Sequence, residues 1–250
     1  MKRILLFVAA LALSACSLVG VNYLIGNGVL VDTNIEVGEF DSISSRCSLD
    51  INYAQSYTSQ SVILTCDENL VEVFDIRVED GVLIVDTKRG ASYSTKSKIF
   101  VTITSPKLSS VKLSGSGDCD ITSPVTAEGD FTFKVSGSGD IEADGVITCK
   151  GFNSTVSGSG NVEVAGVVAE AAYFKDSGSG DIEVDSLTAA DISVKMSGSG
   201  DITLNCKDAG FITADLSGSG DLILSGRARH LQSNTSGSGH VRSTDLSINW

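Results

Sequence analysis

The tetrapeptide Ser-Gly-Ser-Gly occurs seven times in this chain of 250 residues. Its copies begin at Ser114, Ser136, Ser157, Ser177, Ser197, Ser217 and Ser236. The spacing between successive copies stays between 19 and 22 residues. So regular a period indicates a solenoid, in which each repeat forms one coil stacked on the previous one. A flexible Gly/Ser linker is the alternative, but a linker would not carry apolar residues in register between its glycines.

The residues between the tetrapeptides do carry such a register. In the repeat from Ser177 to Met196, apolar and polar residues alternate over Ile182–Val184 and again over Ile192–Met196. Alternation with a period of two is typical of a β-strand with one buried face. The second residue after each tetrapeptide is apolar in every copy: Cys119, Ile141, Val162, Ile182, Ile202, Leu222 and Val241. A coil of about 20 residues is too short for a strand plus an ordinary helix. We therefore predict an all-β fold, a parallel β-helix (solenoid).

The N-terminus has the pattern of a bacterial lipoprotein signal. Met-Lys-Arg precedes an apolar run over Ile4–Leu13, and Leu13-Ser14-Ala15-Cys16 matches a lipobox. We predict a signal peptide over residues 1–15, lipidation of Cys16, and a flexible stem over residues 16–34. The protein would then be exported and anchored to the membrane by lipid in the bacterial cell envelope, at the outer membrane. Which side of that membrane it faces stays open, as does an ordinary cleaved signal with a chance cysteine.

The remaining chain divides at the first tetrapeptide. Residues 35–112 lack Ser-Gly-Ser-Gly but contain short strand-like runs, such as Phe74–Val78 and Ile99–Ile103. We expect these strands to form the irregular first coils of the solenoid or a small sheet packed on its end. In either case they would cap the N-terminal end, because the end coil of a solenoid exposes unpaired strand edges. Residues 113–250 form the repeat β-helix, and its last, apolar-poor coil from Ser236 is expected to be the C-terminal cap.

The net charge restricts the partners. The formal charge is −13, and loss of Lys2 and Arg3 with the signal makes the mature chain more acidic still. A strongly acidic chain disfavours nucleic acid and anionic lipid headgroups. We predict a membrane contact through the N-terminal lipid and no nucleic-acid partner.

The cysteines suggest one disulfide. Five cysteines follow Cys16, an odd number, so at least one thiol stays unpaired within the chain. An exported protein meets oxidising conditions, which allow disulfides to form. Cys47 and Cys66 lie in strand-like segments on either side of the polar stretch Gln55–Gln60, and we predict that they pair.

An acidic residue follows most of the tetrapeptides. The carboxylates are Asp118, Asp140, Asp181, Asp201 and Asp221, with Asn161 and His240 at the equivalent positions. Such a column follows first from repetition itself. Carboxylate oxygens are also the ligands that Ca²⁺ prefers, so the column is a weak calcium candidate, and no other metal site is predicted.

Catalytic patterns are sparse. The chain has only two histidines, His230 and His240, both late in the repeats, and it contains no phosphate-binding or dinucleotide motif. We predict a non-enzymatic protein without a cofactor.

A family resemblance follows from the order of several motifs. Phe40-Asp41-Ser42-Ile43 comes first, then the Asp80-Gly81 turn before Val82–Val85, then Ile103–Leu108 and the repeats. Over about residues 35–250 the chain resembles the bacterial family called putative auto-transporter adhesin, head GIN domain. The resemblance implies a β-helical envelope lipoprotein, and it supplies no catalytic or binding residues.

We therefore expect an adhesin or binding module for a glycan or a protein. Two alternatives remain. A polysaccharide-active β-helix enzyme would need a groove with convergent carboxylates and a basic residue. A structural envelope spacer would show flat coil faces and have no specific ligand.

Overall fold

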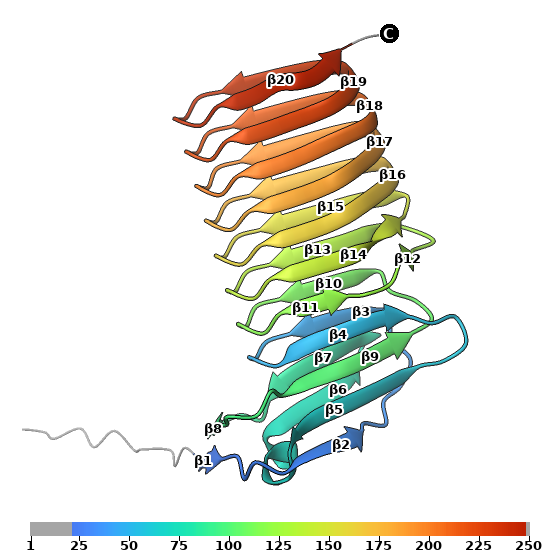
Figure 1. Cartoon of the computed structure of the whole chain (residues 1–250), viewed down its shortest axis with the longest axis vertical. Coiled ribbons are helices and arrows are strands. Elements are labelled where there is room, and N and C mark those ends of the chain that lie inside the picture. Colours follow the sequence, from blue (N-terminus) through green and yellow to red (C-terminus); the bar gives the residue numbers. More distant parts are fainter. Residues whose placement is uncertain (1–21, 249–250) are drawn as a thin grey trace, which may run out of the picture.

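The computed structural model describes residues 22–248, which form one long stack of β-coils (Figure 1). The predicted signal peptide and Cys16 lie outside the described residues. Within residues 22–248, no helix is both long and apolar enough to cross a membrane.

The strands fall into an N-terminal set and a repeat set. The N-terminal set is β1 (Asn22–Ile25), β2 (Leu30–Asn34), β3 (Ser42–Ser45), β4 (Asp50–Gln55), β5 (Ser61–Asp67), the 3₁₀-helix η1 (Glu68–Val73), β6 (Phe74–Glu79), β7 (Val82–Thr87), β8 (Ala91–Ser94) and β9 (Phe100–Ser105). The repeat set is β10 (Ser110–Leu113), β11 (Cys119–Ile121), β12 (Val125–Thr126), β13 (Phe131–Val135), β14 (Ile141–Thr148), β15 (Gly151–Val156), β16 (Val162–Asp176), β17 (Ile182–Met196), β18 (Ile202–Leu216), β19 (Leu222–Thr235) and β20 (Val241–Ile248).

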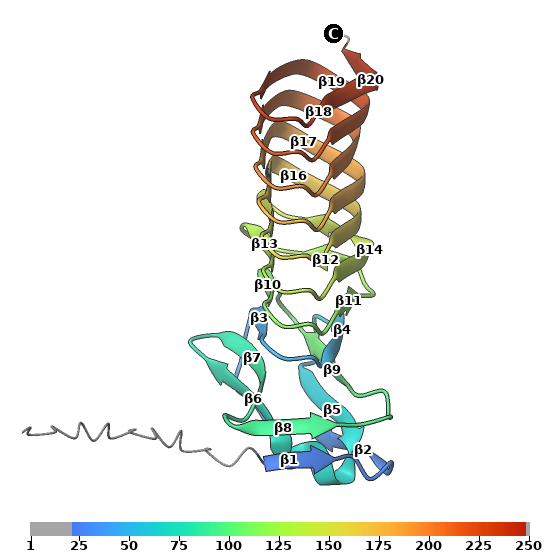
Figure 2. The ribbon, with the colours of Figure 1, turned by 90° about the vertical axis from the view of Figure 1, so that its left-hand side faces the viewer.

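The coils stack through two parallel sheets. Sheet A consists of β7, β3, β10, β13, β15 and the C-terminal parts of β16 to β19. Sheet B consists of β9, β4, β11 and the N-terminal parts of β14 and β16 to β20. Each of β16 to β19 runs along sheet B, bends, and returns along sheet A (Figure 2). The predicted parallel β-helix with coils about 20 residues apart is confirmed.

The interior is filled by columns of apolar side chains, where a column means the residues at equivalent positions of successive coils. Ile141, Val162 and Ile182 stack in register in sheet B, and all three are buried. In sheet A, Phe131 and Phe152 are stacked, with ring centroids 6.3 Å apart. This continuous burial is the main favourable contribution to folding.

The glycines mark a corner where consecutive coils touch through their backbones. A Cβ on Gly200 would lie 2.0 Å from the carbonyl oxygen of Gly180, and the other glycines of the tetrapeptides are equally restricted. None of the tetrapeptide glycines has a positive φ, so close approach of two backbones, and not left-handed geometry, excludes a side chain. At the same corner, the N–H of Ser199 donates to the carbonyl of Gly178 at 2.8 Å.

The N-terminal strands close the stack with a change of direction. β5 pairs antiparallel with both β9 and β2, which extends sheet B, and β6 pairs antiparallel with β7 at the end of sheet A. β1 and β8 form a separate parallel pair at the same end of the stack. Residues 22–34, which we predicted to be part of a flexible stem, therefore contain two paired strands. Irregular strands therefore do precede the repeats. The coil made by β3 and β4 already stacks under the first repeat, with Ser42 opposite Ser110 and Ile51 opposite Cys119.

The predicted disulfide does not form. Cys47 and Cys66 are buried free thiols, like Cys119, Cys149 and Cys206. Sγ of Cys47 donates to the carbonyl of Val85 in β7 at 3.7 Å, whereas Sγ of Cys66 donates to the carbonyl of Asp67 in β5 at 3.4 Å. The two thiols therefore have separate partners in different strands. Burial raises the pKa of Cys66 to about 11, which keeps this thiol protonated and unreactive near neutral pH.

Candidate functional site

The carboxylates of the predicted calcium column form a hydrogen-bonded ladder along one corner of the solenoid. The N–H of Asp201 donates to Oδ1 of Asp181 at 2.7 Å, and the N–H of Asp221 donates in the same way to Oδ1 of Asp201. The ladder runs through Asp50, Asp118, Asp140, Asn161, Asp181, Asp201, Asp221 and His240. Each side chain from Asp50 to Asp221 thus accepts the N–H of the equivalent residue in the next coil, and His240 only donates.

This ladder gives the column a structural role. Asn161 occupies one step and accepts the N–H of Asp181 at 2.8 Å, so a neutral amide serves as well as a carboxylate. Among residues 22–248, no group of three or more His, Cys, Asp or Glu side chains is arranged to hold a metal ion. The structure therefore does not gather the calcium candidates into a cation site.

The two histidines do not meet in a catalytic arrangement. The ring of His230 lies 5.9 Å from that of Phe211 on the outer side of sheet A. His240 ends the ladder, with its Nδ1 3.4 Å from Oδ1 of Asp221. The backbone N–H of His240 and the guanidinium of Arg242 lower the pKa of the Asp221 carboxyl.

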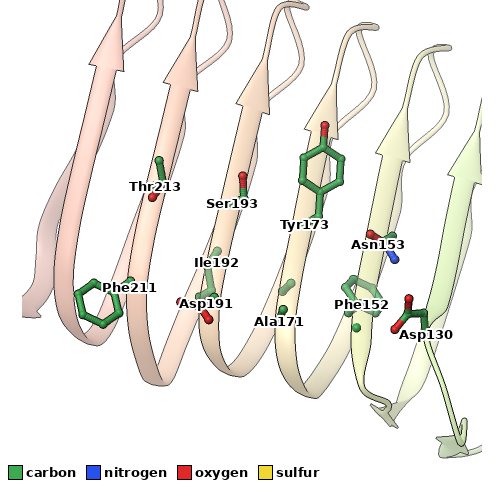
Figure 3. A pocket seen from close by; sticks show the side chains of 12 residues that line it. Asp130, Phe152, Asn153, Ala171, Tyr173, Asp191, Ile192, Ser193, Phe211 and Thr213 are labelled. Atoms are coloured by element: carbon green, nitrogen blue, oxygen red, sulfur yellow. The ribbon is translucent and has the colours of Figure 1, made fainter.

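The outer face of sheet A is hollowed into a shallow groove of about 520 Å³ (Figure 3). Its floor is made by the small residues Gly151 and Ala171, which are neighbours in register. Larger side chains from the same two strands and from the flanking coils border this floor: Asp130, Asn153, Tyr173, Asp191, Ser193, Phe211 and Thr213. The groove forms because two adjacent outward positions lack bulky side chains while the coils on either side keep theirs.

The two carboxylates at the groove come from coils that are not adjacent. Oδ1 of Asp130 is the atom that a Cβ on Gly151 would meet, so the Asp130 carboxylate leans over that floor residue. Ala171 and then Asp191 follow Gly151 in register. Asp130 and Asp191 therefore start three coil steps apart, a backbone separation of about 14 Å.

Four lysines stack beside the groove on the same face. Lys112 is opposite Lys134 in register, and Lys175 is opposite Lys195, with Thr155 between the two pairs. We call Lys112, Lys134, Lys175 and Lys195 the lysine column. Over residues 22–248 none of the four forms an ion pair or side-chain hydrogen bond. Like charges on adjacent strands repel each other, so the column gains from an anionic ligand.

The outer face of sheet B carries the opposite charge. Asp120, Glu142 and Glu163 stack in register there, and Glu183 continues the column. The neighbouring Asp144 raises the pKa of the Glu142 carboxyl by charge repulsion. The solenoid therefore presents an acidic face on sheet B and a lysine-bearing face on sheet A, and the groove of about 520 Å³ lies on the lysine-bearing face.

None of the groove residues or lysines was predicted as a site from the sequence. The signal was present, because each lysine of the column lies two residues before a Ser-Gly-Ser-Gly copy. The groove had no such signal, because it depends on which neighbouring outward side chains are small.

Comparisons with known proteins agree with this architecture. The family described as putative auto-transporter adhesin, head GIN domain, matches residues 39–221 and 177–249. A crystal structure of a putative adhesin from Bacteroides fragilis is 25% identical, with a TM-score of 0.78 over 87% of this chain and 98% of that one. No curated protein matches the chain.

Two structures from Parabacteroides distasonis share the fold at 24% identity. One is a putative adhesin, with a TM-score of 0.76 over 88% of this chain and 99% of that one. The other is named a putative lipid binding protein, with a TM-score of 0.69 over the same shares of the two chains.

Proposed function

Because the chain belongs to the family of putative auto-transporter adhesins with a head GIN domain, we propose that it is a non-enzymatic adhesin that binds an acidic glycan on the outer face of sheet A. The observation that carries this proposal is the groove lying beside the unpaired lysine column. A family of adhesins fits an envelope or extracellular protein, and the lipobox adds a lipid anchor at Cys16.

The groove residues suit a sugar chain. Tyr173 and Phe211 offer apolar ring faces, while Asn153, Ser193 and Thr213 offer groups that exchange hydrogen bonds with hydroxyls. Sites for small ligands combine an apolar surface with a few polar groups in this way. The groove is open and crosses several coils, which favours a polymer lying along the stack.

The positive charge of the lysine column favours an anionic ligand. Its ammonium groups repeat along the same axis as the groove, at one or two coil spacings of about 4.8 Å. A polysaccharide with a carboxylate on each sugar would place successive negative charges along that line. The acidic face of sheet B would repel such a chain, so binding would be restricted to sheet A.

The experiment compares polygalacturonate with neutral dextran by isothermal titration calorimetry. We expect polygalacturonate to bind, and its affinity to fall as salt is added, because the lysines are exposed to solvent. The double variant Lys175→Glu/Lys195→Glu should lose binding. The control Lys96→Glu/Lys207→Glu makes the same change of charge away from the groove and should retain it.

Two results would reject this ligand. One is equal binding of dextran and polygalacturonate. The other is equal loss in the test and control variants, which would show a response to net charge and not to the lysine column. Loss of membrane association in Cys16→Ser tests the anchor separately.

A further inference from the structure

Apolar side chains are exposed at the N-terminal end of the stack. The exposed fractions are 59% for Tyr23, 39% for Leu24, 69% for Ile25, 53% for Val29 and 50% for Leu30. These five residues, which we call the N-terminal apolar patch, lie on β1, directly before β2 and at its first residue. Figure 2 shows both strands at the end of the molecule opposite the C-terminus. Tyr23 and Ile25 share one face of β1, and exposed apolar side chains gathered at one end of a molecule mark a site of interaction.

Hydrogen bonds with Asp67 and Asn69 hold the backbone of the patch in place. The carboxylate of Asp67 accepts the N–H of Gly28 at 2.9 Å and the hydroxyl of Ser97 at 2.8 Å, and it also accepts the hydroxyl of Thr95. Asn69 adds a bond to the carbonyl of Ile25 at 2.8 Å. These bonds fix the turn between β1 and β2, so the apolar side chains cannot turn inward without breaking them.

The patch also lacks charge. Residues 23–31 contain no carboxylate, ammonium or guanidinium group, although the chain as a whole has a net charge of −13. A surface without formal charge avoids the cost of desolvating ions when it enters an apolar medium. Tyrosine, as at position 23, is favoured where the bilayer meets water.

We propose that the N-terminal apolar patch docks onto the lipid bilayer, and this inference rests on the lipid anchor at Cys16 proposed above. Cys16 is six residues before Asn22. Six fully extended residues span at most about 22 Å. The anchor therefore keeps β1 close to the membrane surface at all times, and a nearby bilayer is a more available partner than a second copy of the chain.

The docking would orient the molecule and would not supply its main attachment, because several acyl chains on one residue already anchor a protein stably. Docked in this way, the solenoid would stand on its N-terminal end with its long axis pointing away from the bilayer. Both sheet faces, including the groove, would then lie clear of the membrane surface.

The test measures the depth of single tryptophans in the lipidated full chain. The only native tryptophan is replaced by Trp250→Phe. Tyr23→Trp is then compared with the control Phe211→Trp, a position that is similarly exposed at 57% but lies in a distant coil. Each protein is reconstituted into phosphatidylcholine vesicles with and without brominated acyl chains, which quench tryptophans that enter the bilayer.

We expect the Tyr23→Trp emission to shift to the blue and to be quenched by brominated lipid, while the Phe211→Trp emission changes in neither respect. A protein that floats with the vesicles but shows no quenching at position 23 overturns the docking and leaves the anchor intact. A protein that does not float overturns the anchor and the docking together. A dimer that forms without lipid and buries position 23 would assign the patch to a second copy and also overturn the docking.

Discussion

Asp176 places a carboxyl group in a column that is otherwise mostly apolar. Its neighbours in register are Val156 and Met196, and its side chain is fully buried. Oδ1 accepts the N–H of Gly178 at 2.9 Å, whereas Oδ2 has no partner among the described residues. Burial raises the pKa of this carboxyl above its ordinary value of 3.8. The residue therefore weakens the core in its ionised form.

The first prediction concerns the replacement of this residue. Asp176→Val restores the apolar column and should increase the free energy of unfolding by about 1–3 kcal/mol at pH 7, the usual cost of an unsatisfied buried polar group. Between the unfolded and the raised folded pKa, the folded state binds more protons than the unfolded state. The contribution of Asp176 to stability thus falls as pH rises from about 4 through the folded pKa.

Urea unfolding at several pH values measures both effects. The difference between wild type and Asp176→Val should widen as pH rises through this range and then stay constant. Asp176→Asn keeps the shape but cannot ionise, and it should remove the same pH dependence. A difference that does not vary with pH would show that Asp176 does not titrate in the folded state.

At the scale of the coil, the corner glycines are the most restricted positions. Gly200→Ala would place a methyl group 2.0 Å from the carbonyl oxygen of Gly180. Overpacking of this kind costs about 1–3 kcal/mol, and here backbone, not a flexible side chain, must move. We expect a lower melting temperature. The control Gly129→Ala meets no atom within 4 Å and should melt close to the wild type.

The aspartate ladder gives a prediction of its own. Asp201→Ala removes the acceptor for the N–H of Asp221 and should cost about 0.5–1.5 kcal/mol in denaturant unfolding. Asp201→Asn should keep most of the stability, as the native Asn161 does at its step. Millimolar calcium should leave the melting temperature unchanged. If calcium raised the melting temperature of the wild type but not of Asp201→Asn, the column would also bind calcium, which would contradict a purely structural role.

The coil was predictable because backbone contact at the corner allows only glycine, and that requirement repeats visibly in the sequence. The coil below the first tetrapeptide was predictable only as an irregular one, for the converse reason. Gly115 and Gly117 stack on Cys47 and Leu49, which occupy the glycine positions of the coil below. Below Cys47 and Leu49, the segment between β7 and β9 that contains β8 does not form a corner of the same kind. No backbone therefore excludes their side chains, and Leu49 is fully buried.

The candidate site was predictable only in part. Alternation shows which residues point outward, and the spacing of Lys112, Lys134, Lys175 and Lys195 could have been read from the repeats. The groove depends on Gly151 and Ala171 lying next to each other across two coils. Their register passes through coils of 21 and 20 residues, and only the structure shows which outward positions align.

At the scale of the whole molecule, the two ends of the solenoid are closed in different ways. Antiparallel strands cover the N-terminal end, whereas β20 pairs only with the first part of β19. The inward positions of the second part change from Ala214 and Leu216 to the hydroxyl residues Ser233 and Thr235. Both are exposed, so the polar core positions let this end face water.

The last prediction tests this polar end. Ser233→Val/Thr235→Leu would continue the apolar columns up to an unpaired strand edge, which is a template for association. We expect concentration-dependent oligomers in analytical ultracentrifugation. Gln232→Val/Asn234→Leu places the same side chains on the outward face of that strand. Equal association of both variants would point to general surface hydrophobicity as the cause.

Each interior coil contacts the coil before it and the coil after it in the same way. The contacts are made by its corner glycines and by its residue of the aspartate ladder. Gain or loss of one 20-residue unit by slippage in the encoding DNA would therefore leave both junctions intact. Each such event would change the height of the molecule by about 4.8 Å. A lineage could in this way adjust the length of the solenoid without altering either of its ends.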